Sequence, residues 1–257
     1  MMIKVDLNCD LGESFGAWKM GFDEKIIPFV SSANIACGFH AGDPVVMEKT
    51  VALVKRGGAA AGAHPGFPDL SGFGRRNLAM SPAEVKACVQ YQIGALDAFC
   101  RAAGIRLCHV KPHGALYNMA AKDPALADAI VDAVREINPR LVLLALAGSR
   151  MVLAAREKGI PVAEEVFADR AYEEDGSLVS RTKPGAMITD EEEAIERVLG
   201  MIKNGTVKAV TGRDIQVGAD SVCIHGDGEK ALLFAEKLNA AITKEGITIV
   251  GLEEICS

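Results

Sequence analysis

Near its start the chain reads VDLNCDLGE, residues 5–13, a stretch in which apolar and polar residues alternate. Because successive side chains of a β-strand point to opposite faces, Asp6, Asn8 and Asp10 share one face of this strand. Such a polar face cannot pack against helices, so we expect it to point into the interior of a barrel. Asp10 and Glu13 then lie where the strand gives way to a loop.

A second polar face is predicted further along the chain, where His109, Lys111 and His113 alternate in the same way. This face should point into the same interior. A purely structural interpretation also exists, in which Asp6 and Lys111 form a buried, hydrogen-bonded ion pair with no catalytic task.

The rest of the chain alternates between short apolar runs and longer segments with helical periodicity. Helices are expected after the cap-and-proline pairs at residues 43–44, 81–82 and 123–124, and over residues 149–158, 190–203 and 228–244. This alternation indicates parallel strands joined by right-handed crossovers. The strands are expected at Ile3–Leu7, Ala33–Cys37, Ala59–Ala63, Ile105–Val110, Leu141–Ala147, Pro161–Phe167 and Ser221–Ile224.

Parallel strands can form a closed barrel or an open doubly wound sheet. Four of the five histidines lie where an apolar run meets a Gly/Pro/Asp loop, namely His40, His64, His113 and His225. An open sheet binds ligands where its strand order reverses, whereas a barrel presents functional residues after many of its strands. The sequence therefore predicts a single (β/α) barrel domain over residues 1–257, with the active site at the carboxyl ends of the strands.

The composition argues against several classes of protein. A formal net charge of −6 disfavours binding to nucleic acid, which Lys and Arg drive. No apolar stretch is long enough to span a membrane and the start lacks a signal-peptide pattern, so we expect a cytoplasmic protein. The seven cysteines include no C-x-x-C pair, and most are embedded among apolar residues, which predicts buried, reduced thiols.

His40 and His64 occupy matching positions in loops that follow consecutive predicted strands. Neighbouring glycines let a ligand approach the backbone, and prolines rigidify the loops. A lone loop histidine is most often a surface residue, but two in matching positions favour a site. Asp43 is a candidate for substrate binding, although the N-cap of the next helix is the commoner role for such a residue.

Other chemistries have weaker support. Asp10, His64 and His113 form a conceivable ligand set for a divalent metal ion, but no H-E-x-x-H or C-x-x-C motif supports it. Cys37 lies in a run typical of a structural thiol, and no G-x-S-x-G elbow is present. The chain also lacks a G-x-x-x-x-G-K-[ST] motif, so a nucleotide, if used, is expected to bind elsewhere.

Two later segments carry candidate anion-binding groups. His225 precedes the start of a helix, whose backbone N–H groups attract anions. Residues 170–187 are expected to form a long loop of the kind that often covers a site. Arg170, Arg181 and Lys183 in this loop could hold a carboxylate or a phosphate, although solvated loop charges are commoner.

Longer motifs occur at residues 5–13, 32–43, 62–69 and 110–118, with shorter ones at 167–172 and 224–227. In sequence and in order, these motifs resemble the LamB/YcsF family, the family of the 5-oxoprolinase A subunits. The resemblance covers essentially the whole chain.

This resemblance implies an irregular seven-stranded α/β barrel, similar to a TIM barrel and related to the glycoside hydrolase/deacetylase group. It also implies an ATP-dependent cyclic amide hydrolase, a 5-oxoprolinase, that opens the lactam 5-oxo-L-proline to L-glutamate. Two other subunits, B and C, would complete the enzyme. ATP would be consumed by the assembled complex and handled by these partners, which fits the missing nucleotide motif.

Opening a phosphorylated lactam needs a base for water, a donor to the leaving groups and cations for the phosphate. We expect Asp10 or Glu13 to be the base, and the histidines to donate protons or stabilise the oxyanion. The catalytic candidates are Asp10, Glu13, His40, His64, Lys111 and His113, and the substrate-binding candidates are Asn8, Asn34, Asp43, Tyr117, Arg170, Lys183 and His225.

Two alternatives stay open at this point. A metal-dependent deacetylase acting on carbohydrate or an amide would use Asp10, His64 and His113 as ligands. A non-catalytic subunit would capture lactams without contributing to turnover.

Overall fold

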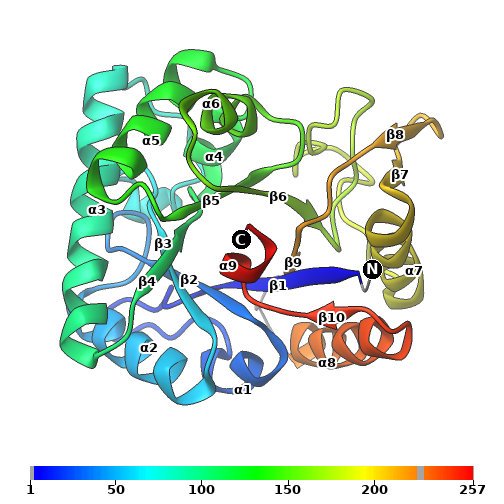
Figure 1. Ribbon diagram of the computed structural model, residues 1–257, viewed down its shortest axis with the longest axis horizontal. Helices are drawn as coiled ribbons and strands as arrows, with labels where there is room; N and C mark the ends of the chain where they lie inside the picture. The colour runs from blue at the N-terminus through cyan, green and yellow to red at the C-terminus, as the bar shows by residue number, and fades with distance from the viewer. Residues whose placement is uncertain (1–2, 225–228, 257) are drawn as a thin grey trace.

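The computed structural model describes residues 3–224 and 229–256. Within them, seven parallel strands close into a barrel with helices around it (Figure 1). The barrel strands are β1 (Lys4–Leu11), β2 (Ser32–Ala36), β3 (Ala60–His64), β4 (Leu107–Val110), β5 (Val142–Leu146), β6 (Val162–Phe167) and β9 (Ser221–Ile224). Closure occurs where β9 pairs with both β6 and β1. The predicted barrel is therefore confirmed, and an open sheet is excluded.

Helices follow most of the barrel strands and cover the outside of the barrel. In the described residues they are α1 (Asp23–Ile26), η1 (Ile27–Phe29), α2 (Pro44–Gly57), η2 (Leu70–Gly72), α3 (Pro82–Ala103), α4 (Gly114–Ala120), α5 (Pro124–Ile137), α6 (Arg150–Lys158), α7 (Glu191–Asn204), α8 (Glu229–Lys244) and α9 (Leu252–Ile255). The side chains of Asp43, Ser81 and Asp123 cap α2, α3 and α5, as predicted. The sequence did not predict α4, because no side chain caps its start after His113.

β1 is longer than the apolar run that predicted it. The expected strand ended at Leu7, but pairing with β2 continues from Asn8 to Leu11. Asp10 therefore belongs to the strand itself, and it shares its inward face with Asn8, since both contact Lys111 across the barrel. The polar interior predicted from the alternation is confirmed.

The two ends of the barrel differ. At the amino-terminal end, α9 lies over the opening, near the middle of Figure 1. Its Leu252 is fully buried and packs against Val142, Leu144 and Ala163 of β5 and β6. This end is therefore closed by apolar contacts, and the other end carries the candidate site.

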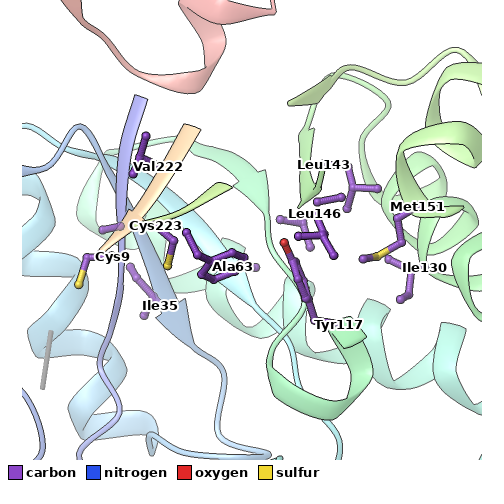
Figure 2. Packing of buried hydrophobic residues seen from close by; sticks show 14 of the residues in the cluster. Cys9, Ile35, Ala63, Tyr117, Ile130, Leu143, Leu146, Met151, Val222 and Cys223 are labelled. Atoms are coloured by element: carbon purple, nitrogen blue, oxygen red, sulfur yellow. The ribbon is translucent and has the colours of Figure 1, made fainter. Parts of the chain in front are cut away.

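Apolar side chains fill the space between the strands and the helices. Leu143 of β5 lies near Ile130 of α5 and Met151 of α6, and all three are fully buried (Figure 2). Burial of each such side chain stabilises the fold by about 1.5–3 kcal/mol. Burial also raises the pKa of the Cys37 thiol to about 12, which agrees with a structural role for this residue.

The chain outside this barrel adds small elements. β7 (Thr206–Lys208) and β8 (Asp214–Gln216) form an antiparallel pair, and β10 (Thr248–Ile249) extends the sheet beside β1. The loop expected at residues 170–187 is held by isolated bridges between Arg170 and Met187 and between Tyr172 and Leu178. No helix in the described part of the chain is long and apolar enough to cross a membrane.

Candidate active site

A pocket of about 570 Å³ lies at the carboxyl ends of the barrel strands. Side chains that follow β1, β3, β4 and β6 form its floor, and residues 177–182 of the long loop form part of its wall. The sequence-predicted residues that line it are Asp10, Glu13, His64, Lys111, His113, Tyr117, Arg170 and Arg181. The carboxyl end of the barrel therefore gathers most of the predicted catalytic residues in one place.

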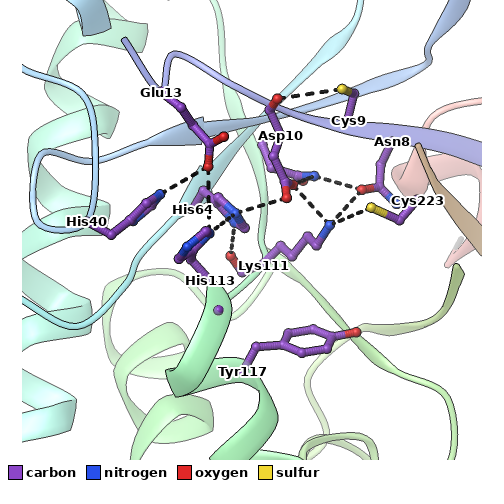
Figure 3. A network of polar contacts seen from close by, with 12 residues as sticks. Asn8, Cys9, Asp10, Glu13, His40, His64, Lys111, His113, Tyr117 and Cys223 are labelled. Carbon is purple, nitrogen blue, oxygen red and sulfur yellow. Dashed lines mark hydrogen bonds and ion pairs between the residues drawn. The ribbon is translucent and has the colours of Figure 1, made fainter. Parts of the chain in front are cut away.

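Lys111 is the centre of a buried charge network. Its Nζ lies 3.0 Å from Asp10 Oδ1 and 2.8 Å from Glu165 Oε1, and it also donates to Asn8 Oδ1 and Cys223 Sγ at 3.0 and 3.2 Å (Figure 3). Burial alone would lower the pKa of this ammonium, but the adjacent carboxylates hold its pKa well above the ordinary value. Lys111 is therefore a fixed positive charge that anchors Asp10.

The alternative structural interpretation, a buried ion pair between Asp6 and Lys111, is wrong. Asp6 lies toward the amino-terminal end of the barrel, where its Oδ1 accepts hydrogen bonds of 2.6 Å from Ser31 and from Ser32. Its other oxygen accepts from Ser221. We call these four residues the serine cluster. Asp6 lies two positions before Asn8 in β1, and Lys111 contacts Asn8 and Asp10, which lie nearer the carboxyl end of the strand.

Glu165 is a site residue that sequence reasoning missed. The signal was the pair Glu164-Glu165 within an apolar strand, because neighbours in a strand face opposite sides and one of them must point inward. Glu164 pairs with Arg156 outside the barrel. Glu165 is fully buried inside it and accepts a 2.6 Å hydrogen bond from the hydroxyl of Tyr117.

Asn8 and Asn34 lie beneath Asp10, and both are fully buried. Asn34 Nδ2 donates to Asp10 Oδ1 at 2.9 Å and to Asn8 Oδ1 at 2.7 Å, and its own oxygen lies 2.7 Å from His109 Nε2. Gly62 leaves the space that the His109 ring fills. These two asparagines therefore hold Asp10 and Lys111 from below, whereas sequence analysis expected them to contact substrate.

His64 and His113 are oriented by backbone carbonyl groups. His64 Nδ1 lies 2.6 Å from the carbonyl oxygen of Lys111, and His113 Nε2 lies 2.8 Å from that of Phe73. A carbonyl oxygen only accepts, so each of these ring nitrogens carries the proton. The opposite nitrogens, His64 Nε2 and His113 Nδ1, face each other at 3.0 Å. His64 Nε2 also lies 3.3 Å from Asp10 Oδ2.

His40 and Glu13 complete this group, and Figure 3 shows them beside the other two histidines. The His40 ring stacks on that of His113, with centroids 3.7 Å apart and planes 2° from parallel. Glu13 Oε1 lies 3.4 Å from His40 Nε2 and 3.7 Å from His113 Nδ1. We call Glu13, His40, His64 and His113 the histidine cluster.

Burial controls the charge of two of these histidines. It lowers the pKa of His113 to about 3, and with the neighbouring histidines it lowers the pKa of His40 well below its ordinary value. Both imidazoles are neutral near pH 7. They are therefore better suited to accept a proton or to ligate an ion than to donate a proton as imidazolium.

Three predicted residues remain. Asp43 and Lys183 do not line the pocket, and His225 is not among the residues that the structure describes. Asp43 caps α2 by accepting from the backbone N–H groups of residues 45 and 46, at 2.8 and 2.9 Å. Lys183 is exposed and pairs with Glu173 at 2.9 Å. The loop before α3 instead contributes Phe73 and Arg75 to the pocket, which sequence analysis did not anticipate.

The histidine cluster could hold a metal ion, since one donor atom from each of its residues lies within 4.8 Å of all the others. It differs from the ligand set considered in sequence analysis by including Glu13 and His40. Asp10 instead lies beside the cluster, with Oδ1 held by Lys111 and Asn34.

The chain is similar to known proteins over nearly its whole length. The model of the LamB/YcsF family matches residues 5–257. The 5-oxoprolinase A subunit of Clostridium beijerinckii is 64% identical over 99% of this chain and 100% of its own length. That of Bacillus subtilis is 54% identical over 98% of both chains.

Solved structures show the same fold. A lactam utilization protein from Thermus thermophilus superposes with a TM-score of 0.91 at 49% identity, covering 97% of this chain and 100% of that one. A putative cellobiose-phosphate cleavage protein from Enterococcus faecalis has a TM-score of 0.57 at 14% identity, over the full length of both chains, and shares the fold alone.

Proposed function

Because the chain belongs to the LamB/YcsF family, we propose that it is the A subunit of an ATP-dependent 5-oxoprolinase. In this enzyme, ring opening of 5-oxo-L-proline to L-glutamate takes place in the pocket at the carboxyl end of the barrel. ATP is handled by two partner subunits, B and C. The observation that carries the proposal is the pocket itself, which combines an anchored carboxylate, histidines oriented by backbone carbonyl groups and a cationic wall.

Asp10 is the base that activates water. Lys111 and Asn34 hold its Oδ1 at 3.0 and 2.9 Å, while its Oδ2 is directed to His64 at the pocket floor. A carboxylate positioned on one oxygen can accept a proton on the other without losing its orientation. Glu13, the other candidate, belongs to the histidine cluster on the far side of His64.

The pocket wall supplies cations for the anionic parts of the substrate. Arg75, Arg170 and Arg181 line it, and Arg170 is buried and fixed by a 2.6 Å hydrogen bond from its Nη2 to the carbonyl oxygen of Val179. Guanidinium groups suit carboxylate and phosphate because they donate two parallel hydrogen bonds. A phosphorylated lactam carries both of these anionic groups.

Partner subunits fit the chemistry of an unactivated lactam, which is a poor electrophile. Phosphorylation of its oxygen would make the ring carbon reactive, and the chain lacks a phosphate-binding loop for ATP. We therefore assign ATP to the partners. The seven free thiols favour a reducing compartment, consistent with a cytoplasmic enzyme.

Reconstitution tests this function. Glutamate formation from 5-oxoproline and ATP is measured with this chain alone, with candidate B and C subunits alone, and with all three together. We expect turnover only from the complete set, and Asp10→Asn should reduce kcat by about 10²–10⁴-fold. Lys203→Ala, which removes an exposed ion pair with Glu245 on the outer helices, is the matched control.

Two results would contradict the proposal. Full turnover with Asp10→Asn would remove Asp10 from the base role, and lactam binding with no effect of any pocket substitution would make this chain a capture subunit. Because the histidine cluster could hold a metal ion, a metal-dependent deacetylase is the alternative function. Release of acetate from acetylated sugars or amides is therefore assayed on the same preparations.

A further inference from the structure

The histidine cluster contains an arrangement that two neutral imidazoles alone do not favour. His64 and His113 each use one ring nitrogen to donate to a backbone carbonyl, so in the neutral form of both rings the facing nitrogens, 3.0 Å apart, both present lone pairs. Two lone pairs at this distance repel each other. A positive centre between them would turn the repulsion into attraction.

The nearest lysine does not provide that positive centre. The hydrogen bonds of the Lys111 ammonium go to Asn8, Asp10 and Cys223, and its other close partner is Glu165. Asn8 and Cys223 lie on the side of Asp10 away from the cluster, as Figure 3 shows. Neither ring nitrogen of His40 forms a hydrogen bond with the described residues, although the ring is fully buried.

We propose that the histidine cluster binds one divalent transition-metal ion of the zinc type. Donor atoms about 2.0–2.1 Å from a shared tetrahedral ion lie roughly 3.3–3.4 Å from each other. Three of the six separations bracket this value: 3.0 Å between His64 Nε2 and His113 Nδ1, 3.4 Å from Glu13 Oε1 to His40 Nε2, and 3.7 Å from Glu13 Oε1 to His113 Nδ1. All six lie within 4.8 Å, so small side-chain shifts would bring the four donors around one ion.

The surroundings of the cluster are those of a metal site. Metal-binding histidines usually donate their second N–H to a carbonyl or carboxylate, which fixes the ring and its tautomer. The carbonyl groups of Lys111 and Phe73 do this for His64 and His113. Gly66 and Gly74 make room for the stacked rings, because a Cβ at these positions would lie 2.6 Å from His40 Nδ1 and 2.8 Å from His113 Cδ2.

The donor types select the ion. Three imidazole nitrogens and one carboxylate favour Zn²⁺, Co²⁺ or Fe²⁺, whereas Mg²⁺ and Ca²⁺ prefer oxygen ligands. When bound, such an ion supplies Lewis acidity beside Asp10, which is 3.3 Å from His64. The proposal concerns the ligands of this chain and does not depend on which reaction the pocket performs.

The first test uses the unmodified full chain without partners or lactam. The protein is stripped with a chelator, re-equilibrated with Zn²⁺, Co²⁺ or Mg²⁺, and dialysed, and bound metal is measured by atomic emission. We expect about one equivalent of Zn²⁺ or Co²⁺, no retained Mg²⁺, a higher Tm with Zn²⁺, and a Co²⁺ absorption spectrum typical of four-coordinate nitrogen and oxygen ligands. A folded chain that retains none of these ions would overturn the proposal.

Matched carboxylate variants then identify the ligands. Glu13→Gln should weaken Zn²⁺ binding by more than about 100-fold, while Asp10→Asn should retain about one equivalent. The reverse result would replace this cluster with the Asp10-based set and contradict the proposal. Thermal unfolding of both variants confirms that each is folded before metal is measured.

A third measurement needs no variant. Nitrogen-15 NMR of the histidine rings in the metal-free chain should show His64 protonated on Nδ1 and His113 on Nε2. If one proton bridges the facing nitrogens and zinc does not displace it, a protonated histidine pair occupies the place assigned here to the metal. Because none of these readouts is turnover, the metal proposal can fail while the 5-oxoprolinase proposal stands, and the reverse also holds.

Discussion

The serine cluster and the histidine cluster are both buried polar groups inside the same barrel, yet they are built in opposite ways. In the serine cluster, Asp6 accepts three hydroxyl hydrogen bonds, and apolar contacts of α9 close the barrel end nearby. In the histidine cluster, ring nitrogens of His64 and His113 face each other at 3.0 Å beside an open pocket. Mutual satisfaction of buried polar groups indicates a structural role, whereas donors aimed at a common point indicate a ligand.

Lys111 lies between these two clusters and belongs to neither. It is surrounded by partners, as in a structural network, but one of them is Asp10 at the pocket floor. Substitutions at the carboxyl end of the barrel should therefore mainly reduce turnover, and substitutions toward the amino-terminal end should mainly reduce stability.

The largest effect is expected in the histidine cluster. Glu13→Gln keeps the side-chain volume but removes a carboxylate ligand of the proposed metal ion beside Asp10, and should lower kcat for 5-oxoproline in the reconstituted enzyme by about 10²–10⁴-fold. Its free energy of unfolding without added metal should change little. Normal turnover combined with a large loss of stability would show that Glu13 has a structural role, and would contradict the distinction drawn between the two clusters.

Lys111→Met should mainly affect stability. It would leave the fully buried carboxylate of Glu165, and the partly exposed one of Asp10, without their shared cation, at a cost of about 3 kcal/mol in urea unfolding. The double variant with Glu165→Gln removes one of those charges and should recover part of the loss. Equal stabilities of the single variant and the unmodified chain would show that the network is not held together by this charge.

The serine cluster should make stability depend on pH. Burial outweighs the serine hydrogen bonds and raises the pKa of Asp6 from 3.8 to about 6, so the native state binds this proton more tightly than the unfolded chain. Its contribution to stability is therefore present below about pH 4 and is lost as the pH rises through about 6. The shift corresponds to roughly 3 kcal/mol.

Urea unfolding between pH 4 and 7 measures this term as the difference between the unmodified chain and Asp6→Asn. The stability advantage of the unmodified chain should fall across this window and level off above it. A constant difference would show that Asp6 titrates with an ordinary pKa despite its burial.

The smallest effect is expected at Asp43, a polar residue outside both clusters. Asp43→Ala removes two N-cap hydrogen bonds to α2 and should cost about 1 kcal/mol of unfolding free energy. Turnover at a temperature where the variant is folded should be retained. A fall in kcat/KM under those conditions would restore the substrate-binding role predicted from the sequence.

The barrel and the end that carries the site were predictable because their signals are local. Alternation along β1 and around Lys111 marks the inward faces, and the caps Asp43, Ser81 and Asp123 mark where helices begin. The predicted ends of the strands were less accurate than their positions in the chain. The apolar run ended the expected strand at Leu7, but pairing with β2 takes β1 to Leu11, in agreement with the alternation that had placed Asn8 and Asp10 on its inner face.

Individual contacts were less predictable than residue types. Sequence analysis considered an Asp6–Lys111 ion pair and Asp10 as a metal ligand, whereas the barrel registers bring Glu165 to Lys111 and Glu13 to the histidines. Contacts between residues of different strands depend on the shear of the whole barrel. A strand pattern states which face a side chain takes, but it does not state which side chain stands opposite.

The sequence by itself determined the α/β alternation, the polar interior of the barrel and the family, because periodicity, caps and motifs are written in neighbouring residues. Only the tertiary structure decided which polar groups satisfy one another and which gather beside the open pocket. It did so through two backbone carbonyl groups, those of Lys111 and Phe73, which set the protonated nitrogens of His64 and His113. Such carbonyl groups carry no signal in the sequence, since every residue has one and only the fold directs it.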